Sequence, residues 1–339
     1  MVIDQQKEIR LYLAPMMKRT DRHFRYLVRL ISPSIHLFTE MIPAELILHG
    51  NREHALEFSK LEEPIAIQLG SSNPDLLSKA AEVSTYWGYN EVNLNCGCPS
   101  SQVLKGKFGA HLMRDPVLAA NCINAMRTNT PPDIPISAKI RLGIDELYSY
   151  EYLSDFVGRL IDAGATIIQV HARKALVKLN PKRNRNIPPI NYDWAYHLKR
   201  EYRDILVILN GEINNVDSAK LHLRKLDGIM IGRLAYAQPL QLNHFDQSLF
   251  PKSTATNRTV ADILEKYFEY VDNELTKGTS LRQLLQHLFN LFHGQPQAKR
   301  WRKFLTESIV DKNMTVVKLQ TETNKIIERL LNNLKDCPL

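Results

Sequence analysis

The feature of this 339-residue sequence that most restricts its fold is the alternation of short apolar runs with amphipathic stretches. Eight such runs precede residue 233, and most are rich in Val, Ile or Leu, as strands buried on both faces are. The runs are residues 11–16, 35–41, 64–70, 91–96, 134–141, 166–171, 205–210 and 228–232. Helical patterns are predicted at 21–30, 52–59, 73–86, 116–128, 150–162, 193–202 and 216–223.

Strands that alternate with helices pair in parallel through right-handed crossovers. Eight such units close naturally into a (β/α)8 TIM barrel, which typically takes about 250 residues. An open, doubly wound sheet is the alternative, but it calls for a G-x-G-x-x-G turn after the first strand, where this chain has Pro15, Met16 and Met17. We therefore predict an α/β barrel over residues 1–250.

The pattern changes after the polar segment 251–257. From residue 258 to residue 335 apolar residues recur at spacings of three and four, which is typical of helices. No strand candidate occurs in this stretch. We predict a separate all-helical domain over residues 258–339.

Several classes of protein are excluded by simpler features. No run of 18 apolar residues occurs, and the first ten residues lack the apolar segment of a signal peptide. The four cysteines, Cys96, Cys98, Cys122 and Cys337, are therefore expected to be reduced thiols of a cytoplasmic protein. Because the first two are spaced C-x-C and no second pair exists, no metal site is expected.

The charge is basic and locally concentrated, with 44 Lys and Arg against 36 Asp and Glu. Residues 173–185 hold six bases and no acid, and residues 299–303 hold four bases around Trp301. A single cluster of this kind is usually a solvated surface. Two clusters without acids favour a polyanionic partner such as a nucleic acid. Trp301 is interpreted as helix packing rather than as a base-stacking residue.

Polar residues end most of the predicted strands, which in a barrel is where active sites form. They are Gln68, Asn93, Asn95, Lys139, Arg141, Gln169, His171, Asn210, Glu212 and Arg233, with Gly211 and Gly232 between the last of them. A single polar residue at a strand end is usually a satisfied structural group. Since each unpaired buried polar group costs roughly 1–3 kcal/mol, so many of them are interpreted as ligand contacts.

Lys139 and the glycines after the last two strands suggest the kind of ligand. Gly211 and Gly232 allow backbone N–H groups to approach a phosphate, which barrels commonly bind at this point, although each glycine alone is compatible with a plain turn. A lysine inside a barrel calls for an anion, such as the ring of a reduced flavin. A Schiff-base lysine is the alternative. The nearby amides of Gln68 and Asn95 favour the flavin.

Cys98 stands just beyond the fourth predicted strand, followed by Pro99. A thiol at this point is mostly protonated at neutral pH and suits a general acid. The alternative is a small buried apolar residue, for which Cys96 is the better candidate because it still lies on the strand. No Ser-His-Asp or His-Glu-x-x-His arrangement is present.

These residues lie in strings that resemble the tRNA-dihydrouridine synthases. The strings are Leu13-Ala14-Pro15-Met16 with Thr20-Asp21, Gln68-Leu69-Gly70, Asn93-Leu94-Asn95-Cys96-Gly97-Cys98-Pro99-Ser100, Lys139-Ile140-Arg141-Leu142-Gly143, Val170-His171-Ala172-Arg173, Asn210-Gly211 and Ile231-Gly232-Arg233. Residues 20–25, 171–174 and 180–189 resemble the A-type bacterial subfamily. The resemblance implies a flavin-binding barrel followed by a helical tRNA-binding domain. It implies NADPH-dependent reduction of uridine to dihydrouridine at positions 20 and 20a of the tRNA D-loop.

The resemblance also assigns roles to residues. It implies FMN contacts from Pro15, Met16, Met17, Gln68, Lys139, His171, Asn210, Gly211, Glu212, Gly232 and Arg233. Cys98 is the implied proton donor, Asn95 and Arg141 the implied lining of the substrate pocket. Contacts to tRNA are implied for Lys182, Arg185, Lys299 and Arg302. No membrane and no obligate protein partner is expected.

Two other functions are compatible with parts of this pattern. A small-molecule flavin oxidoreductase similar to dihydroorotate dehydrogenase has the same phosphate loops but needs no basic helical domain. A tRNA-binding module without catalysis predicts no bound flavin. Flavin absorbance of the purified protein distinguishes both flavin enzymes from the non-catalytic tRNA-binding module. Salt-sensitive binding of tRNA distinguishes the synthase from the small-molecule oxidoreductase.

Overall fold

The computed structural model describes residues 9–251 and 258–335, with side chains described up to residue 330. They form two compact units. The first unit holds residues up to Thr20 together with Ile35–Gly232, and the second holds Asp21–Ser34 together with the chain from Arg233 onward. Each unit is described by itself.

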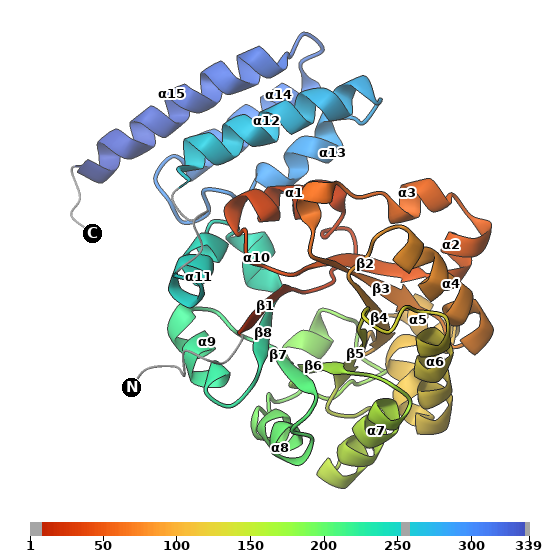
Figure 1. Cartoon of the computed structure of the whole chain (residues 1–339). Coiled ribbons are helices and arrows are strands. Elements are labelled where there is room, and N and C mark those ends of the chain that lie inside the picture. The colour runs from red at the N-terminus through yellow and green to blue at the C-terminus, as the bar shows by residue number, and fades with distance from the viewer. Residues whose placement is uncertain (1–8, 252–257, 336–339) are drawn as a thin grey trace. The chain divides into compact units, whose positions relative to one another are not determined.

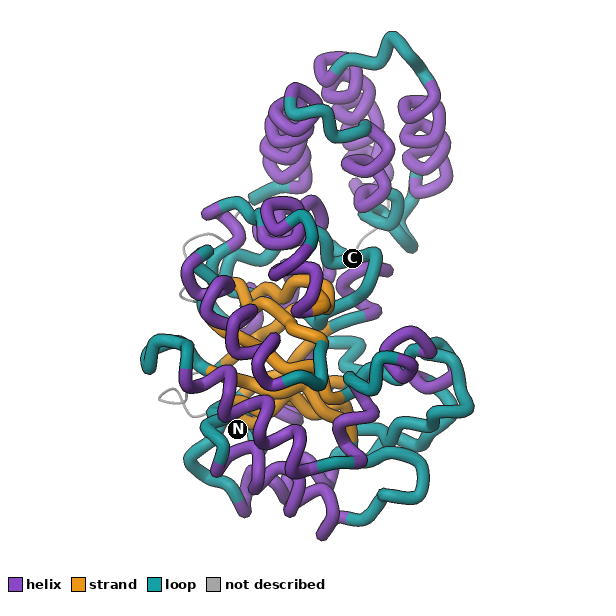
Figure 2. The backbone as a smooth tube through the Cα atoms, turned by 90° about the vertical axis from the view of Figure 1, so that its right-hand side faces the viewer, coloured by secondary structure: helices purple, strands orange, loops and turns teal. Residues whose placement is uncertain are grey.

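The first unit is an eight-stranded parallel sheet in the order β1-β8-β7-β6-β5-β4-β3-β2 (Figures 1 and 2). The strands are β1 (Arg10–Leu13), β2 (Leu37–Pro43), β3 (Ile65–Gly70), β4 (Glu91–Cys96), β5 (Ile136–Arg141), β6 (Ile167–His171), β7 (Leu206–Asn210) and β8 (Gly228–Ile231). The sheet closes where His36, just before β2, pairs with β1: Leu13 N–H donates to His36 O at 2.9 Å and His36 N–H donates to Leu11 O at 2.8 Å. The predicted barrel and all eight strands are confirmed.

Helices, purple in Figure 2, surround the strands, which are orange. They are α2 (Ala44–His49), α3 (Arg52–Leu56), α4 (Pro74–Tyr86), α5 (Ser101–Lys105), α6 (Pro116–Thr128), α7 (Tyr150–Asp162), α8 (Asp193–Glu201) and α9 (Val216–Leu223), with short 3-10 turns η1 (Lys60–Glu62), η2 (Gly109–Arg114) and η3 (Arg183–Arg185). Local signals start the longer helices: Asp115 caps α6 by accepting from Leu118 N–H, and Ser149 caps α7 by accepting from Tyr152 N–H. The helix predicted at 52–59 begins at the expected residue but is too long, because α3 ends at Leu56; the short helix α2 precedes it.

The lower interior of the barrel is largely apolar, with the buried Glu91 as an exception. Tyr12, Phe38, Ile208 and Met230 belong to one buried cluster that also holds Ala14, Ala66 and Ile167. Because side chains alternate along a strand, the residues two positions further along β3 to β7 also face inward, and there the interior becomes polar. The apolar layer thus supports a polar layer at the carboxyl ends of the strands.

The second unit is helical. Its elements are α1 (Arg22–Ile31), α10 (Arg233–Ala237), α11 (Gln241–Leu249), α12 (Val260–Thr276), α13 (Leu281–Leu285), η4 (Gln286–Leu288), α14 (Ala298–Val310) and α15 (Val316–Lys335). Helix α1 packs on α12, where His23 Nδ1 lies 2.7 Å from the Tyr270 hydroxyl and Arg22 Nη2 lies 2.5 Å from Glu274 Oε2. Residues 21–34 and 233–250 therefore group with the C-terminal helices, although they precede the polar segment at 251–257. In the described ranges, no helix combines the length and apolarity needed to cross a membrane.

Candidate active site

The carboxyl ends of the central strands bring the predicted polar residues into one layer of the barrel. The strand register pairs Asn95 with Lys139, Arg141 with His171, and His171 with Asn210. These residues come from β4 to β7, so no short stretch of sequence contains the site. The structure thus places them side by side, while the role of each stays a prediction.

Lys139 is a cation in this layer with a neutral partner. Its Nζ donates to Asn210 Oδ1 at 3.0 Å, and Asn210 in turn donates from Nδ2 to Met230 O at 2.9 Å. Within residues 9–251 and 258–335, no carboxylate forms an ion pair with Lys139. Burial, reinforced by the positive charge of Arg141, lowers the pKa of Lys139 to about 7. A bound anion would compensate this cation.

An amide wall lies beside the lysine. Gln68 is buried, and its Oε1 accepts from Asn95 Nδ2 at 2.7 Å while its Nε2 donates to Asn93 Oδ1 at 2.8 Å. Each amide group has more hydrogen-bonding capacity than these contacts use. Gln68 therefore keeps a donor and an acceptor position for the edge of a heterocycle. Asn93 and Gln169, which were interpreted as ligand contacts, are fully buried and bond to protein groups.

The Cys98 loop is held by hydrogen bonds to its backbone. Asn95 Oδ1 accepts from Gly97 N–H at 3.1 Å and from Cys98 N–H at 2.9 Å, and Cys98 O accepts from Ala110 N–H at 3.0 Å. Cys98 is half-buried, whereas Cys96 is fully buried and burial raises the pKa of its thiol. The prediction that Cys96 is the buried small residue is confirmed. Cys337 lies outside the described residues.

Arg141 ties two loops together. Its Nε donates to Gly97 O at 2.9 Å, and its Nη1 donates to Lys174 O at 3.1 Å and to Asn184 O at 3.2 Å. Because burial lowers the pKa of this guanidinium only to about 10, it stays charged at neutral pH. Arg141 thus joins the loop that carries Cys98 to the basic segment 173–185. Its predicted contact with substrate is not tested by this geometry.

The glycines after β7 and β8 have the backbone features of a close approach. Gly211 has φ +128°, and a Cβ on Gly232 would lie 3.3 Å from Ala14 Cβ. After β1, the Met16–Thr20 turn is closed by Thr20 Oγ1, which accepts from Met16 N–H at 2.9 Å. Glu212, by contrast, forms an ion pair with Arg173. Arg233 starts α10 and belongs to the second unit.

The predicted tRNA-contacting bases lie in both units. Lys182 is exposed and Arg185 is half-buried in the loop around η3, whose core is the buried Asn184. Lys299 and Arg302 are exposed and three residues apart on α14, so they share a face. Trp301 is fully buried and donates from Nε1 to Leu288 O at 2.6 Å, which confirms its interpretation as helix packing.

Glu91 is the buried group that the sequence interpretation missed. It occupies the first position of β4, is fully buried, and accepts from Ser137, Gln169 and Tyr12. Burial raises its pKa to about 7. An acid at the first position of a strand predicted to be buried was a detectable signal, because a buried carboxylate requires several partners.

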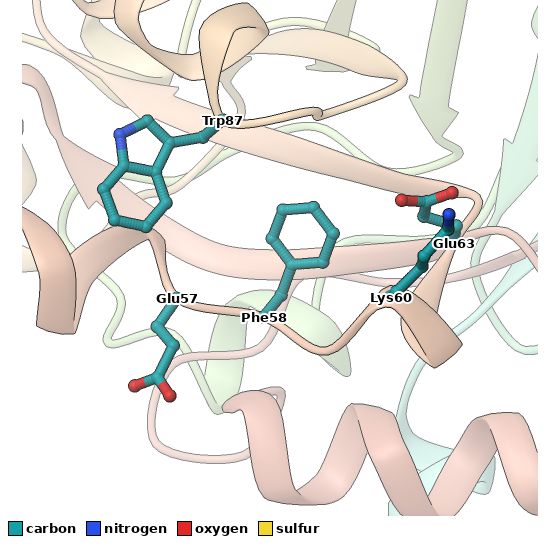
Figure 3. A pocket seen from close by; sticks show the side chains of 5 residues that line it. All are labelled: Glu57, Phe58, Lys60, Glu63 and Trp87. Atoms are coloured by element: carbon teal, nitrogen blue, oxygen red, sulfur yellow. The ribbon is translucent and has the colours of Figure 1, made fainter.

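A separate surface hollow lies away from this layer. Figure 3 shows its lining, Glu57, Phe58, Lys60, Glu63 and Trp87. These residues precede β3 and β4 in the chain, so they mark the amino ends of the strands, opposite the polar layer. Over the described ranges, no group of three or more His, Cys, Asp or Glu side chains is arranged to hold a metal ion.

Known proteins resemble this chain over most of its length. A profile of the dihydrouridine synthase family matches residues 12–330. The chain belongs to the dihydrouridine synthase family. It is therefore an oxidoreductase whose reaction forms dihydrouridine, as the resemblance implied.

Individual relatives extend this result. The chain is 45% identical over 300 residues to the tRNA-dihydrouridine(20/20a) synthase of Xanthomonas campestris pv. campestris, and the match covers 88% of each chain. It is 44% identical to the Synechocystis sp. enzyme of that name, over 88% of this chain and 89% of the relative. It is 41% identical to the Vibrio parahaemolyticus enzyme, over 95% and 98% respectively.

Solved structures with little sequence similarity share the fold. An old yellow enzyme homologue from Zymomonas mobilis has a TM-score of 0.51 at 11% identity and covers 75% of this chain and 92% of its own. Morphinone reductase has a TM-score of 0.50 at 11% identity, over 70% and 85%. These likenesses support the barrel.

Proposed function

We propose that this chain reduces uridines 20 and 20a in the D-loop of tRNA, with FMN as its bound cofactor and NADPH as the reductant. The relatives that match it over nearly nine tenths of its length are named for these two positions. We also propose the cytoplasm as its location, where its tRNA substrate is found.

The observation that carries the FMN proposal is the half-buried Lys139, which lacks a carboxylate partner among the described residues and lies beside an amide wall. The residues fit an anionic heterocycle, because Lys139 supplies a cation and Gln68 an unused donor and acceptor. The Gly211 and Gly232 backbone suits the phosphate of the same molecule. A reduced flavin bound here supplies a hydride to C6 of uracil. Proposed further contacts come from Pro15, Met16, Met17, His171, Asn210, Glu212 and Arg233.

Cys98 is the proposed proton donor to C5 of the uracil ring. Both backbone polar groups of Cys98 are hydrogen-bonded, its N–H to Asn95 and its carbonyl to Ala110, which holds this residue at the carboxyl end of β4. Asn95 and Arg141 are proposed to line the pyrimidine pocket. Because a flavin that donates the hydride would cover one face of the uracil ring, the thiol would have to approach C5 from the opposite face.

The two regions divide the work in this proposal. Residues 1–250, which include all eight strands of the barrel, carry the chemistry, and residues 258–339 hold tRNA through bases that include Lys299 and Arg302. Lys182 and Arg185 contact phosphates near the barrel mouth. Since a stacked base cannot reach a barrel interior, the uridine must be flipped out, and a poorly stacked loop base lowers this cost.

The test is Cys98→Ala with Cys122→Ala as the matched control, because Cys122 is buried in α6 and outside the polar layer. The expected result is normal reduction of the bound flavin by NADPH and loss of dihydrouridine formation in Cys98→Ala only. Dihydrouridine is measured by mass spectrometry of digested tRNA. Normal dihydrouridine formation by Cys98→Ala would reject the proton-donor role.

Binding measurements separate this function from that of a small-molecule flavin enzyme. Unmodified tRNA should bind with an affinity that falls steeply as salt rises, because phosphate contacts release counterions. Salt-independent or undetectable tRNA binding would favour the small-molecule enzyme.

A further inference from the structure

A buried carboxylate lies beneath the proposed active site and has no role in the reaction described above. Glu91 Oε1 accepts from Ser137 Oγ at 2.5 Å and from Gln169 Nε2 at 2.9 Å. Its Oε2 accepts from the Tyr12 hydroxyl at 3.4 Å, and His36 Nε2 lies 3.5 Å away. Glu91 is therefore the acceptor on which several interior donors converge.

Four side-chain amides connect this carboxylate to the Cys98 loop. Gln169 Oε1 accepts from Asn93 Nδ2 at 2.8 Å, and Asn93 Oδ1 accepts from Gln68 Nε2 at 2.8 Å. Gln68 Oε1 accepts from Asn95 Nδ2 at 2.7 Å, and Asn95 Oδ1 accepts from the N–H groups of Gly97 and Cys98. We call the series Gln169, Asn93, Gln68 and Asn95 the amide relay.

The two ends of the amide relay determine the orientation of every amide in it. An ionised carboxylate only accepts, and a backbone N–H only donates. If any one amide turned over, it would place two acceptors or two donors against each other. Asn93 is held twice, because its Nδ2 also donates to Ser137 Oγ at 2.7 Å, and Ser137 donates to Glu91.

We propose that Glu91 is a positioning residue that acts through the amide relay to orient Asn95 and, through it, the loop that carries Cys98. The inference rests on the proposed function only in naming Cys98 as the proton donor. Both acceptor positions of Asn95 Oδ1 are used by the loop, so Asn95 offers a ligand one N–H and no acceptor. This leaves a donor suited to a carbonyl oxygen of uracil.

The test compares Glu91→Met with Glu91→Gln. The methionine removes the acceptor at a similar volume, whereas the glutamine keeps an acceptor oxygen for Ser137 and Gln169 without the charge. Hydrogen–deuterium exchange of the peptide containing the Gly97 and Cys98 amides, in the purified protein at pH 8 without tRNA, reports the bonds to Asn95. We expect exchange about tenfold faster in Glu91→Met, since one net hydrogen bond is worth about that factor, and within about twofold of wild type in Glu91→Gln.

Two controls separate the relay from general destabilisation. Ser137→Ala removes only the side branch, so the 97–98 amides should stay within about twofold of wild type. Ile168→Ala creates a cavity at a fully buried position of β6 whose side chain points away from Gln169. Ile168→Ala should speed hydrogen–deuterium exchange throughout the barrel. The 97–98 amides should then change no more than the amides of α7, whose peptides serve as the internal reference.

The outcomes are decisive in either direction. Unchanged exchange in Glu91→Met, or equally fast exchange in Glu91→Gln, would overturn the relay. If Glu91→Met does not fold, Asn93→Leu cuts the relay while leaving Glu91 with Ser137 and Gln169, and it must show the same selective exchange. The rate of dihydrouridine formation should follow the protection of the 97–98 amides from exchange, so it should fall more in Glu91→Met than in Glu91→Gln. Should Cys98→Ala prove fully active, the proton-donor role of Cys98 fails, while the exchange test of Glu91 still stands.

Discussion

Replacing Lys139 with methionine should stabilise the protein without cofactor and weaken its function. The pKa of Lys139 is lowered to about 7 from 10.5, so the cofactor-free fold carries the cost of a desolvated ammonium. At about 1.36 kcal/mol per pH unit this difference corresponds to about 5 kcal/mol. Because the side chain is partly exposed and water screens it, we expect about 2–3 kcal/mol.

The sign of the pH dependence follows from proton binding. Between pH 7 and pH 10.5 the unfolded chain binds the Lys139 proton and the folded chain releases it, so folding of the wild type becomes more favourable as pH rises. The advantage of Lys139→Met should therefore be largest at or below pH 7 and vanish near pH 10.5. With a reduced flavin bound, the wild type should be more stable than Lys139→Met. An anion about 4 Å from the ammonium gains about 4 kcal/mol at an effective dielectric constant of 20.

The assay is thermal unfolding of flavin-free wild type and Lys139→Met from pH 6.5 to pH 10. A gain of 2–3 kcal/mol should raise the Tm of the barrel transition by about 5–10 °C at pH 7. The reduction potential of the bound flavin should fall in the variant, because the cation that stabilises the reduced form is gone. A Tm below wild type at pH 7, or a gain that grows with pH, would refute the reasoning.

Three further predictions follow from the loops around the site. Gly109→Ala should lower dihydrouridine formation at least tenfold, because φ at Gly109 is +63° and the new Cβ would lie 2.8 Å from Cys98 O. The control is Gly278→Ala, where φ is also positive (+87°) but no atom lies within 4 Å of the new Cβ. Equal activity of the two variants would contradict the prediction. Asn184→Ala should weaken tRNA binding several-fold while leaving flavin content unchanged, since Asn184 bonds Leu176 and Leu179 to hold the basic loop; lost flavin would count against it. The double variant Lys299→Glu and Arg302→Glu should reduce the salt slope of tRNA affinity by about one per lost contact, whereas Lys325→Glu on α15 should not; an unchanged slope would exclude α14 from the interface.

Much of the fold was predictable because its signals are local. The strand β4 and the helices α6 and α7 have the bounds expected from the sequence. Apolar runs of five or six residues predict strands buried on both faces, while Pro116 and the cap Ser149 mark helix starts. The site was predictable in outline for a related reason, since parallel strands bring their carboxyl ends to one edge.

The partners of individual side chains were not predictable in this way. Arg141 and Glu212 were expected to contact ligands, yet the structure bonds Arg141 to three backbone carbonyls and pairs Glu212 with Arg173. Helix α1 was expected as an ordinary barrel helix, but it groups with the C-terminal helices through contacts such as His23 with Tyr270. These contacts join residues far apart in the chain, so no local pattern encodes them.

The amino-acid sequence by itself determined the eight strands, the helices between them and the set of residues at the barrel mouth. These depend on burial, periodicity and capping, which act over a few neighbouring residues. Only the tertiary structure decided that Gln169, Asn93, Gln68 and Asn95 form one directed series between Glu91 and Cys98. The physical reason is that the orientation of an amide depends on the donors and acceptors that face it, and closure of the barrel brings these from three different strands.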